Sequence, residues 1–332
     1  MTPQTKEAAG KRTGSEPVDI SVVIVTWNSL KYIRECLTTV DAGRGSLSME
    51  VIVVDNASSD GTQEVVRREY PWACLIDSGD NLGFARGNNL GIAHSHGKYL
   101  ALVNSDVNVP KDCFTSLFRF MENNADIGMA GPQLIDGNGN PGRSTMKFLT
   151  LWNVFCRAIV LDRLPFARRL FGGFLMADLR ANAPLDVDVL NGWFWMLRRS
   201  AVAEVGVLDH RFFMYGEDID WSHRFHQGGW RVVLYPGAQA VHYGGGSSER
   251  TPVRLAVERE KANLQYWRKF HGRASTLLYR ALCSLNVFVR WAGFSVASLL
   301  ARSSRDIVAI KRKRSAACLQ WLITSKYVNE EK

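Results

Sequence analysis

The stretch that decides the fold runs from Val51 to Asp60 and reads VIVVDNASSD. Its first four residues are all β-branched, which is typical of a strand buried on both faces. Turn and helix-cap residues follow directly, and a helical pattern covers 62–69. Asp55 therefore stands at the carboxyl end of a buried strand, where open α/β sheets bind ligands. An alternative of equal weight is that Ser58 or Ser59 caps the helix and that Asp55 is merely solvated.

Strand and helix patterns alternate on both sides of this stretch. Strands are predicted at 20–26, 72–79, 99–103, 127–134 and 231–235, and helices at 30–40, 62–69, 110–123 and 218–227. This alternation predicts a mostly parallel, doubly wound sheet. The loops at 26–28, 55–60 and 104–106 carry polar residues after strand ends, so we expect them to line one crevice.

The composition is that of a globular protein with an anionic partner. The chain has 332 residues, 46% hydrophobic residues and a net charge of +9, which suits nucleotide phosphates or anionic lipid. Six cysteines without a CxxC pair predict free thiols in a reducing compartment. Residues 1–18 lack an apolar core and predict a disordered tail.

The last quarter of the chain has a different sequence pattern. Residues 251–332 are predicted to form a helical extension without strands. The segment 276–300 is apolar but carries Arg280 and Arg290, so we expect no long uncharged run of the kind that spans a membrane. With the basic run 311–314, it predicts either contact with a membrane surface or a helical cap or dimer interface. The segment 146–176 suggests helices over the acceptor side or, again, a membrane surface.

Six motifs, in order, resemble the family 2 glycosyltransferases of the GT-A fold, and among these the bacterial rhamnosyltransferases. They are SVVIVTWN at 21–28, VIVVDNASSDGT at 51–62, NLGFARGNN at 81–89, LVNSDV at 102–107, NGWFWMLRR at 191–199 and YGEDIDW at 215–221. The resemblance implies a Rossmann-like, mostly parallel sheet flanked by helices over 19–250. It also implies inverting transfer of a sugar from a nucleotide-sugar donor.

The resemblance also implies roles for particular residues. The donor pocket would comprise Thr26, Trp27, Asn28, Asp55, Asn56, Ser58, Asn81, Gly83, Phe84, Asn88, Asn89, Asn104 and Ser105, with Asp55 accepting the N3–H of uracil or thymine. Gly192 and Trp193 would contact the donor sugar or the acceptor. Asp218 would be the base that deprotonates the acceptor hydroxyl, supported by Glu217 and Asp220.

A divalent metal, Mg²⁺ or Mn²⁺, is the implied cofactor, with Asp106 as its ligand and His242 as a second one. The family's Asp-x-Asp metal motif reads Asn104-Ser105-Asp106 in this chain, so an amide replaces one carboxylate. The acidic residues of the YGEDIDW motif have a simpler interpretation, a charge cluster that suits a helix N-terminus.

Three classes of protein compete. The first is an inverting glycosyltransferase with dTDP-L-rhamnose as donor, or a UDP-hexose, and a lipid-linked or cell-envelope glycan as acceptor. The second is a nucleotide-binding oxidoreductase, which the absence of a G-x-G-x-x-G fingerprint disfavours. The third is a non-catalytic protein that binds nucleotide sugars. The first predicts a cytoplasmic enzyme, peripheral on the inner membrane face, without nucleic acid as a partner; it leaves the oligomeric state open.

Overall fold

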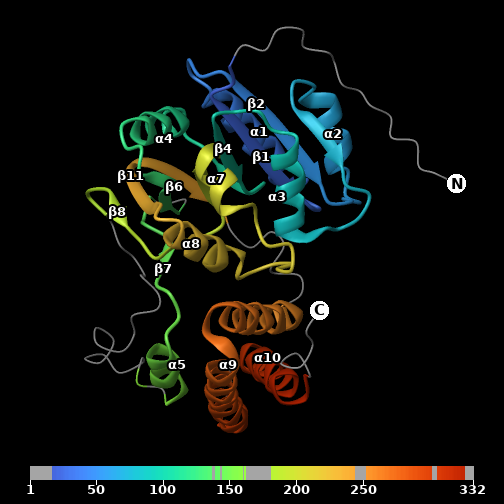
Figure 1. The fold of residues 1–332 in the computed structure, drawn as a ribbon. Helices are drawn as coiled ribbons and strands as arrows, with labels where there is room; N and C mark the ends of the chain where they lie inside the picture. The colour runs from blue at the N-terminus through green and yellow to red at the C-terminus, as the bar shows by residue number, and fades with distance from the viewer. Residues whose placement is uncertain are drawn as a thin grey trace, which may run out of the picture.

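The computed structural model describes residues 17–136, 139–142, 144–159, 161, 181–243, 252–300 and 305–325. A mixed sheet of nine strands forms its centre, with helices around it and a helical arm at the C-terminal end (Figure 1). Residues 1–16, which hold most of the expected disordered tail, lie outside the described residues. So does most of the second half of the segment 146–176.

Four parallel strands form the first half of the sheet. They are β1 (Ile20–Thr26), β2 (Met49–Asp55), β3 (Cys74–Asp77) and β4 (Tyr99–Val103), in the order β3-β2-β1-β4. Their apolar runs are almost fully buried in β1, β2 and β4, as expected for strands covered on both faces. The register pairs Thr26 with Asp55, so the polar residues that follow these strands meet at one edge.

The second half of the sheet is mixed. Strand β10 (Phe194–Arg198) runs antiparallel between β4 and β6 (Ile127–Ile135), and β11 (Arg231–His242) runs parallel to β6. Antiparallel β5 (Val107–Asn108) and β8 (Leu185–Asp186) pair with β11. A separate small sheet joins β7 (Thr145–Met146) to β9 (Val189–Leu190).

Helices cover both faces of the sheet because the strand residues alternate. In β1, Ile20, Val22 and Ile24 face one core with α1 (Ile33–Ala42), α2 (Thr62–Glu69) and α4 (Cys113–Glu122). Val23 faces a second core with α3 (Gly83–Ala93), α7 (Arg199–Val205) and α8 (Glu217–Gln227). This two-sided packing confirms the predicted α/β class. All six cysteines are free thiols.

Strand β11 is longer than the sequence pattern predicts. The expected strand ends at Tyr235, because Pro236 and Gly237 normally interrupt strands. The observed strand continues to His242, and a register shift against β6 between Tyr235 and Gln239 accommodates the interruption. The continuation matters for function because it brings His242 opposite Val107 of β5, next to Asp106.

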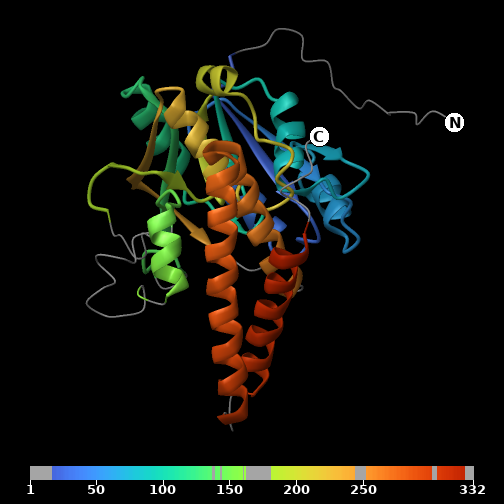
Figure 2. The same cartoon turned by 60° about the horizontal axis from the view of Figure 1, so that its bottom comes forward.

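The C-terminal region is helical, as expected. Helix α9 (Pro252–Leu300) breaks at Gly272, whose φ of 73° is left-handed, so it consists of two helices. The second part pairs with α10 (Arg305–Thr324), and this hairpin extends away from the sheet (Figure 2). Helix α5 (Leu151–Ala158) packs on its side through a shared apolar cluster.

By length and composition alone, one helix of the described chain could cross a membrane. The segment Val253–Ser298 contains an 18-residue window of mean hydropathy 1.2, of which 11% is buried. The expectation that no long uncharged run is present is a narrower statement, because Arg280 and Arg290 interrupt this segment. Core helices of soluble proteins can pass the same test, so this finding is weak evidence of a membrane span.

Candidate functional site

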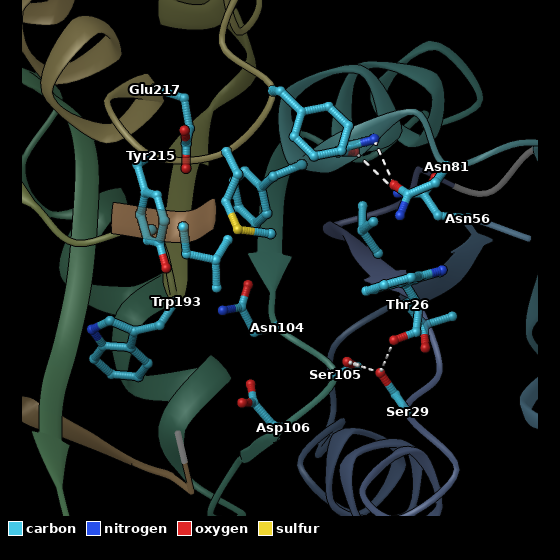
Figure 3. A pocket seen from close by; sticks show the side chains of 18 of the residues that line it. Thr26, Ser29, Asn56, Asn81, Asn104, Ser105, Asp106, Trp193, Tyr215 and Glu217 are labelled. Atoms are coloured by element: carbon cyan, nitrogen blue, oxygen red, sulfur yellow. Dashed lines mark hydrogen bonds between the residues drawn. The ribbon is translucent and has the colours of Figure 1, made fainter. Parts of the chain in front are cut away.

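A cavity of about 730 Å³ opens at the carboxyl ends of the first strands, within the usual size range of small-molecule sites. Residues from both halves of the sheet and from α8 and α9 line it. Figure 3 shows side chains from both halves of the sheet, such as Thr26 and Trp193, around one space with Glu217 of α8. The predicted site residues among its lining are Thr26, Trp27, Asn28, Asn56, Asn81, Gly83, Phe84, Asn104, Ser105, Asp106, Gly192, Trp193, Glu217, Asp218 and His242.

The Asp55 carboxylate is fully buried at the end of β2. Its Oδ1 accepts hydrogen bonds from the backbone N–H of Ser58 (2.8 Å) and from the Gln63 side-chain amide (2.7 Å). Its Oδ2 and the Thr26 hydroxyl are buried and have no partner among the described residues. A buried carboxylate oxygen without a partner is costly, so this position is suited to a donor N–H from a ligand.

The loops after β1 and β2 are tied together by side-chain hydrogen bonds. Asn28 has a left-handed φ of 52°, and its backbone N–H donates to Ser58 Oγ at 2.8 Å. Helix α2 begins only at Thr62, with Gly61 at its N-cap. The alternative of a helix capped by Ser58 or Ser59 above a solvated Asp55 is therefore wrong.

The turn before α3 forms a second wall. The Asn81 side chain accepts the Gly83 N–H at 3.0 Å, and Asn56 Nδ2 donates to the Gly83 carbonyl at 3.1 Å. Gly83 has a φ of 77°, and a Cβ there would lie 2.5 Å from the Phe213 carbonyl oxygen. Only glycine therefore fits at this position. The Phe84 N–H also donates to that carbonyl, at 2.9 Å, and so couples this wall to the loop before α8.

Asp106 and His242 lie next to each other in the cavity lining. The sheet brings them together because His242 ends β11 and Asp106 precedes β5, its antiparallel partner. Asp106 Oδ1 and His242 Nε2 are 3.1 Å apart, and the His242 ring stacks on Trp193. Within the described part of the chain, no three His, Cys, Asp or Glu residues form a metal site by themselves. This pair therefore offers two ligands at most, and a bound metal would need further oxygen ligands.

Glu217 and Asp218 begin α8, after Tyr215 and Gly216, whose φ values of 70° and 80° are both left-handed. Burial raises the pKa of Asp218 to about 6, although the backbone N–H of Ile219 bonds its Oδ1 at 2.9 Å and opposes that rise. Burial and the neighbouring Asp218 charge raise the pKa of Glu217 well above its usual range. Perturbed carboxyl groups that line a cavity are candidates for acid–base chemistry.

Asp220, the third acid of this motif, is placed differently. Its carboxylate is fully buried and pairs with Lys269 of α9 (2.5 Å) and with Arg224 of α8 (2.8 Å). Lys269 also pairs with Asp209 at 2.8 Å. Asp220 therefore lies outside the cavity lining and holds α8 against α9.

The remaining predicted residues outside the lining also have partners in the fold. The Asn89 side chain donates to the Leu208 carbonyl at 2.7 Å and accepts the Leu208 N–H at 3.1 Å. Asn88 donates to the Phe84 carbonyl at 2.9 Å. With Ser58 and Asp55, they stand behind the lining rather than in it.

Several lining residues have no counterpart in the sequence prediction. They are Val25, Ser29, Tyr32, Asn191, Phe213, Met214, Tyr215, Arg254, Leu255 and Glu258. Val25, Asn191 and Tyr215 lie inside quoted motifs, and Ser29, Phe213 and Met214 lie within two residues of one, so a wider margin around the motifs would include them. Arg254, Leu255 and Glu258 belong to the first turns of α9, and only the three-dimensional arrangement reveals them. Arg254 is the one Lys or Arg among the described lining residues.

Comparison with known proteins gives a consistent result. A family model described as Glycosyl transferase family 2 matches residues 21–206. Over 254 residues the chain is 26% identical to an N-acetylglucosaminyl-diphospho-decaprenol L-rhamnosyltransferase of Mycobacterium tuberculosis, covering 73% of this chain and 82% of the relative. It is 25% identical over 211 residues to a low-salt glycan biosynthesis hexosyltransferase of Haloferax volcanii, covering 62% and 61% of the two chains.

Among solved structures, the fold is similar to that of a mannosyltransferase from Pyrobaculum calidifontis in complex with GDP-Man and Mn²⁺. The TM-score is 0.53 at 16% sequence identity, and the alignment covers 94% of this chain and 89% of the other. At this identity the similarity concerns the fold.

Proposed function

Because the chain belongs to glycosyl transferase family 2, we propose that it is an inverting glycosyltransferase that moves a sugar from a nucleotide-sugar donor to a glycan acceptor. The observation that carries this proposal is the convergence on one cavity of Asp106, His242 and Asp218. They come from two strand ends and a helix start that are far apart in the sequence.

In the proposed reaction, the acceptor hydroxyl attacks the anomeric carbon of the donor sugar. Asp218 takes the hydroxyl proton as the new C–O bond forms, and the bond from the anomeric carbon to the diphosphate oxygen breaks with its electron pair on the leaving group. A single positioned carboxylate suffices as the base in such a displacement. Burial and the Asp218 charge raise the pKa of Glu217, which favours its neutral form beside an ionised Asp218.

We propose Asp106 and His242 as the ligands of a divalent metal, Mg²⁺ or Mn²⁺. The donor set fits, because a carboxylate and an imidazole converge to 3.1 Å and a substrate diphosphate can complete the coordination. When bound, such an ion neutralises the charge that develops on the leaving diphosphate. The backbone holds the two ligands in place: the N–H of Tyr243 donates to the Asp106 carbonyl at 3.1 Å.

Asp55 stands just behind the lining, next to the lining residues Thr26 and Asn56. Its buried, unpartnered Oδ2 supports recognition of a nucleobase that reaches past them. Uracil and thymine carry an N3–H that can donate to a carboxylate, whereas the same edge of cytosine offers only an acceptor at N3. Guanine also has such a donor at N1, so our preference for a uridine or thymidine base rests in addition on the resemblance to rhamnosyltransferases. Trp27, which is partly exposed at the cavity, supplies an aromatic face beside it.

We propose dTDP-L-rhamnose as the donor and a lipid-linked sugar of the cell envelope as the acceptor. The support is the resemblance to the mycobacterial relative, whose name gives a diphospho-decaprenol-linked acceptor and L-rhamnosyl transfer. A UDP-hexose donor is the second candidate, because the haloarchaeal relative is named a hexosyltransferase. These assignments imply a cytoplasmic, membrane-peripheral enzyme whose catalytic unit, residues 19–250, is completed by the first turns of α9.

A donor panel tests this function. The chain is incubated with dTDP-L-rhamnose, UDP-glucose, UDP-N-acetylglucosamine and GDP-mannose, each with N-acetylglucosaminyl-diphospho-prenol and Mn²⁺, and the released nucleotide is measured. Release from dTDP-L-rhamnose that depends on the acceptor supports the proposal. Release from UDP-sugars alone would show that the donor is a UDP-sugar and not dTDP-L-rhamnose. Binding without release from any donor would favour a non-catalytic role.

A prediction concerns Arg254, whose side chain makes no hydrogen bond or ion pair within the described residues while it lines the cavity. We expect it to bind a phosphate of the donor. Arg254→Gln should then raise the donor KM by roughly 10- to 100-fold, the value of a hydrogen bond to a charged group, about 1.5–3 kcal/mol. Steady-state kinetics check it.

The control is Arg119→Gln, on the exposed surface of α4, which should leave the donor KM unchanged. If Arg254→Gln raises only the acceptor KM, the contact is with the acceptor. If it changes neither, Arg254 binds no phosphate.

A further inference from the structure

The hairpin of α9 and α10 presents an apolar face that nothing in the described fold covers. Its α9 residues are 36–57% exposed although all are large and hydrophobic: Leu277, Leu278, Leu285, Phe288, Val289, Trp291 and Val296. At about 100° per residue these seven lie within an arc of about 160°. Isolated exposed apolar residues are ordinary, but a contiguous stripe of this length marks an interaction surface.

The opposite side of the same helix makes the internal contacts. Tyr279, Cys283 and Val287 are buried in a cluster with α5 and α10, and Asn286 bonds the Arg157 carbonyl of α5. The α9 hairpin therefore has one side that packs within the protein and another, the apolar face defined above, that points away. If α9 and α10 formed a cap folded onto the catalytic domain, this face would be buried. In the structure it is exposed.

The charge of the hairpin region points to the nature of the partner. Residues 273–332 contain 11 Lys and Arg but only three Asp and Glu. This segment therefore carries +8 of the net charge of +9 of the chain. The run 311–314 is exposed on α10, and Lys311 lies over the Phe294 ring of α9 at 5.9 Å. The positive charge thus adjoins the apolar helix on the same arm.

We propose that this arm binds the surface of a bilayer that contains anionic phospholipid, with the apolar face of α9 in the interface and the basic run 311–314 at the headgroups. Apolar side chains and adjacent cations on one helical unit are the combination that anionic membranes bind. The arm lies on the membrane and does not cross it, because four consecutive cations in the middle of α10 would be costly at the bilayer centre.

This orientation places the catalytic site where a lipid-linked substrate can reach it. This part of the proposal rests on the proposed function. The first turns of α9 line the cavity through Arg254, Leu255 and Glu258. The helix then turns at Gly272 into the arm. An arm held on the membrane therefore keeps the cavity close to the headgroup layer, where the diphosphate of a lipid-linked sugar lies.

Sedimentation of the full chain with vesicles tests the proposal. We expect binding to vesicles of phosphatidylcholine with 30% phosphatidylglycerol, and at least ten-fold weaker binding to phosphatidylcholine alone. One variant combines Leu285→Gln, Phe288→Gln and Val296→Gln, and a second replaces all four cations of 311–314 with Gln. Each should lower the partition coefficient at least ten-fold. Lys111→Gln with Arg119→Gln is the control for lost charge; Arg119 is exposed on α4, and Lys111 is exposed just before that helix.

Several outcomes would overturn the proposal. Wild-type chain that does not sediment with anionic vesicles refutes it, as do arm variants that bind as well as the wild type. A wild-type dimer in analytical ultracentrifugation that the apolar triple variant dissociates would assign the face to a second copy of the chain. Vesicle binding needs no sugar donor, and transfer to a short-chain, water-soluble acceptor needs no bilayer. Failure of the arm and failure of the proposed enzyme activity are therefore separable.

Discussion

Replacing Asp218 with Asn is expected to lower turnover by roughly 10²–10⁴-fold, the usual contribution of a positioned acid or base. The amide keeps the shape of the side chain but cannot take the acceptor proton. Donor affinity should hardly change, because we assign Asp218 to the acceptor side of the reacting carbon. Initial rates together with donor titration measure the two quantities separately. Asp126→Asn, on the exposed surface, is the control.

The pH dependence of the same carboxylate provides an independent check. The base works only when ionised, and burial raises the pKa of Asp218 to about 6. For the wild type, kcat/KM should therefore fall as the pH drops below about 6 and reach a plateau above it. The Asp218→Asn variant should lose this acidic limb. If the variant keeps near-normal turnover, the base lies elsewhere, and Glu217 becomes the first candidate.

Asp106→Asn is expected to act on a different step. This substitution weakens the proposed metal site that Asp106 shares with His242, so the diphosphate would lose the positive charge that a bound ion supplies. Donor affinity in the presence of Mn²⁺ should fall by about ten-fold or more, as expected when an interaction with a charged group is lost. Turnover should fall with it. Donor titration by calorimetry, with and without Mn²⁺, is the measurement.

The two variants should differ in how their donor affinity responds to Mn²⁺. Without metal, wild type and Asp106→Asn should bind the donor with similar affinity. Mn²⁺ should raise the donor affinity of the wild type but not that of Asp106→Asn. Mn²⁺ should raise the donor affinity of Asp218→Asn as much as that of the wild type. An Asp106→Asn variant whose donor affinity responds fully to Mn²⁺ would show that the metal, if bound, has other ligands.

Local sequence predicts the first half of the fold well because its strands are buried on both faces. Such strands are short continuous apolar runs, and those of β1, β2 and β4 end abruptly at polar residues. Parallel pairing then brings these ends to one edge, as the register of Thr26 with Asp55 illustrates. The burial of Asp55 follows from the same arrangement, although its sequence neighbours Ser58 and Ser59 equally suggested a solvated turn.

Longer-range features could not be predicted in this way. The continuation of β11 to His242 depends on pairing with β6 and β5, which overrides the local effect of Pro236 and Gly237. Asp220 belongs to the same acidic cluster as Asp218. Helical geometry turns it to the other side of α8, where Lys269 of α9 neutralises it. No local pattern gives that pairing, because the two residues are 49 positions apart.

The entry of α9 into the site is likewise a tertiary effect. Its first turns resemble any amphipathic helix, and they gain a role only because α9 packs beside α8 at Ala262, whose Cβ would lie 3.0 Å from a Cβ at Gly216. The exposed apolar face of the hairpin was ambiguous for a related reason. A helical sequence shows that such a face exists, whereas only the arrangement of α5, α9 and α10 shows which side remains uncovered.

The anomeric configuration of the transferred sugar is the most direct test of the proposed inverting mechanism. The wild-type chain is given dTDP-L-rhamnose, N-acetylglucosaminyl-diphospho-prenol and Mn²⁺, and the product is examined by NMR. Inverting transfer predicts a new glycosidic bond with the configuration opposite to that of the donor, formed by wild type and nearly absent with Asp218→Asn. A product with the donor's configuration, or no transfer from any nucleotide sugar, would contradict it.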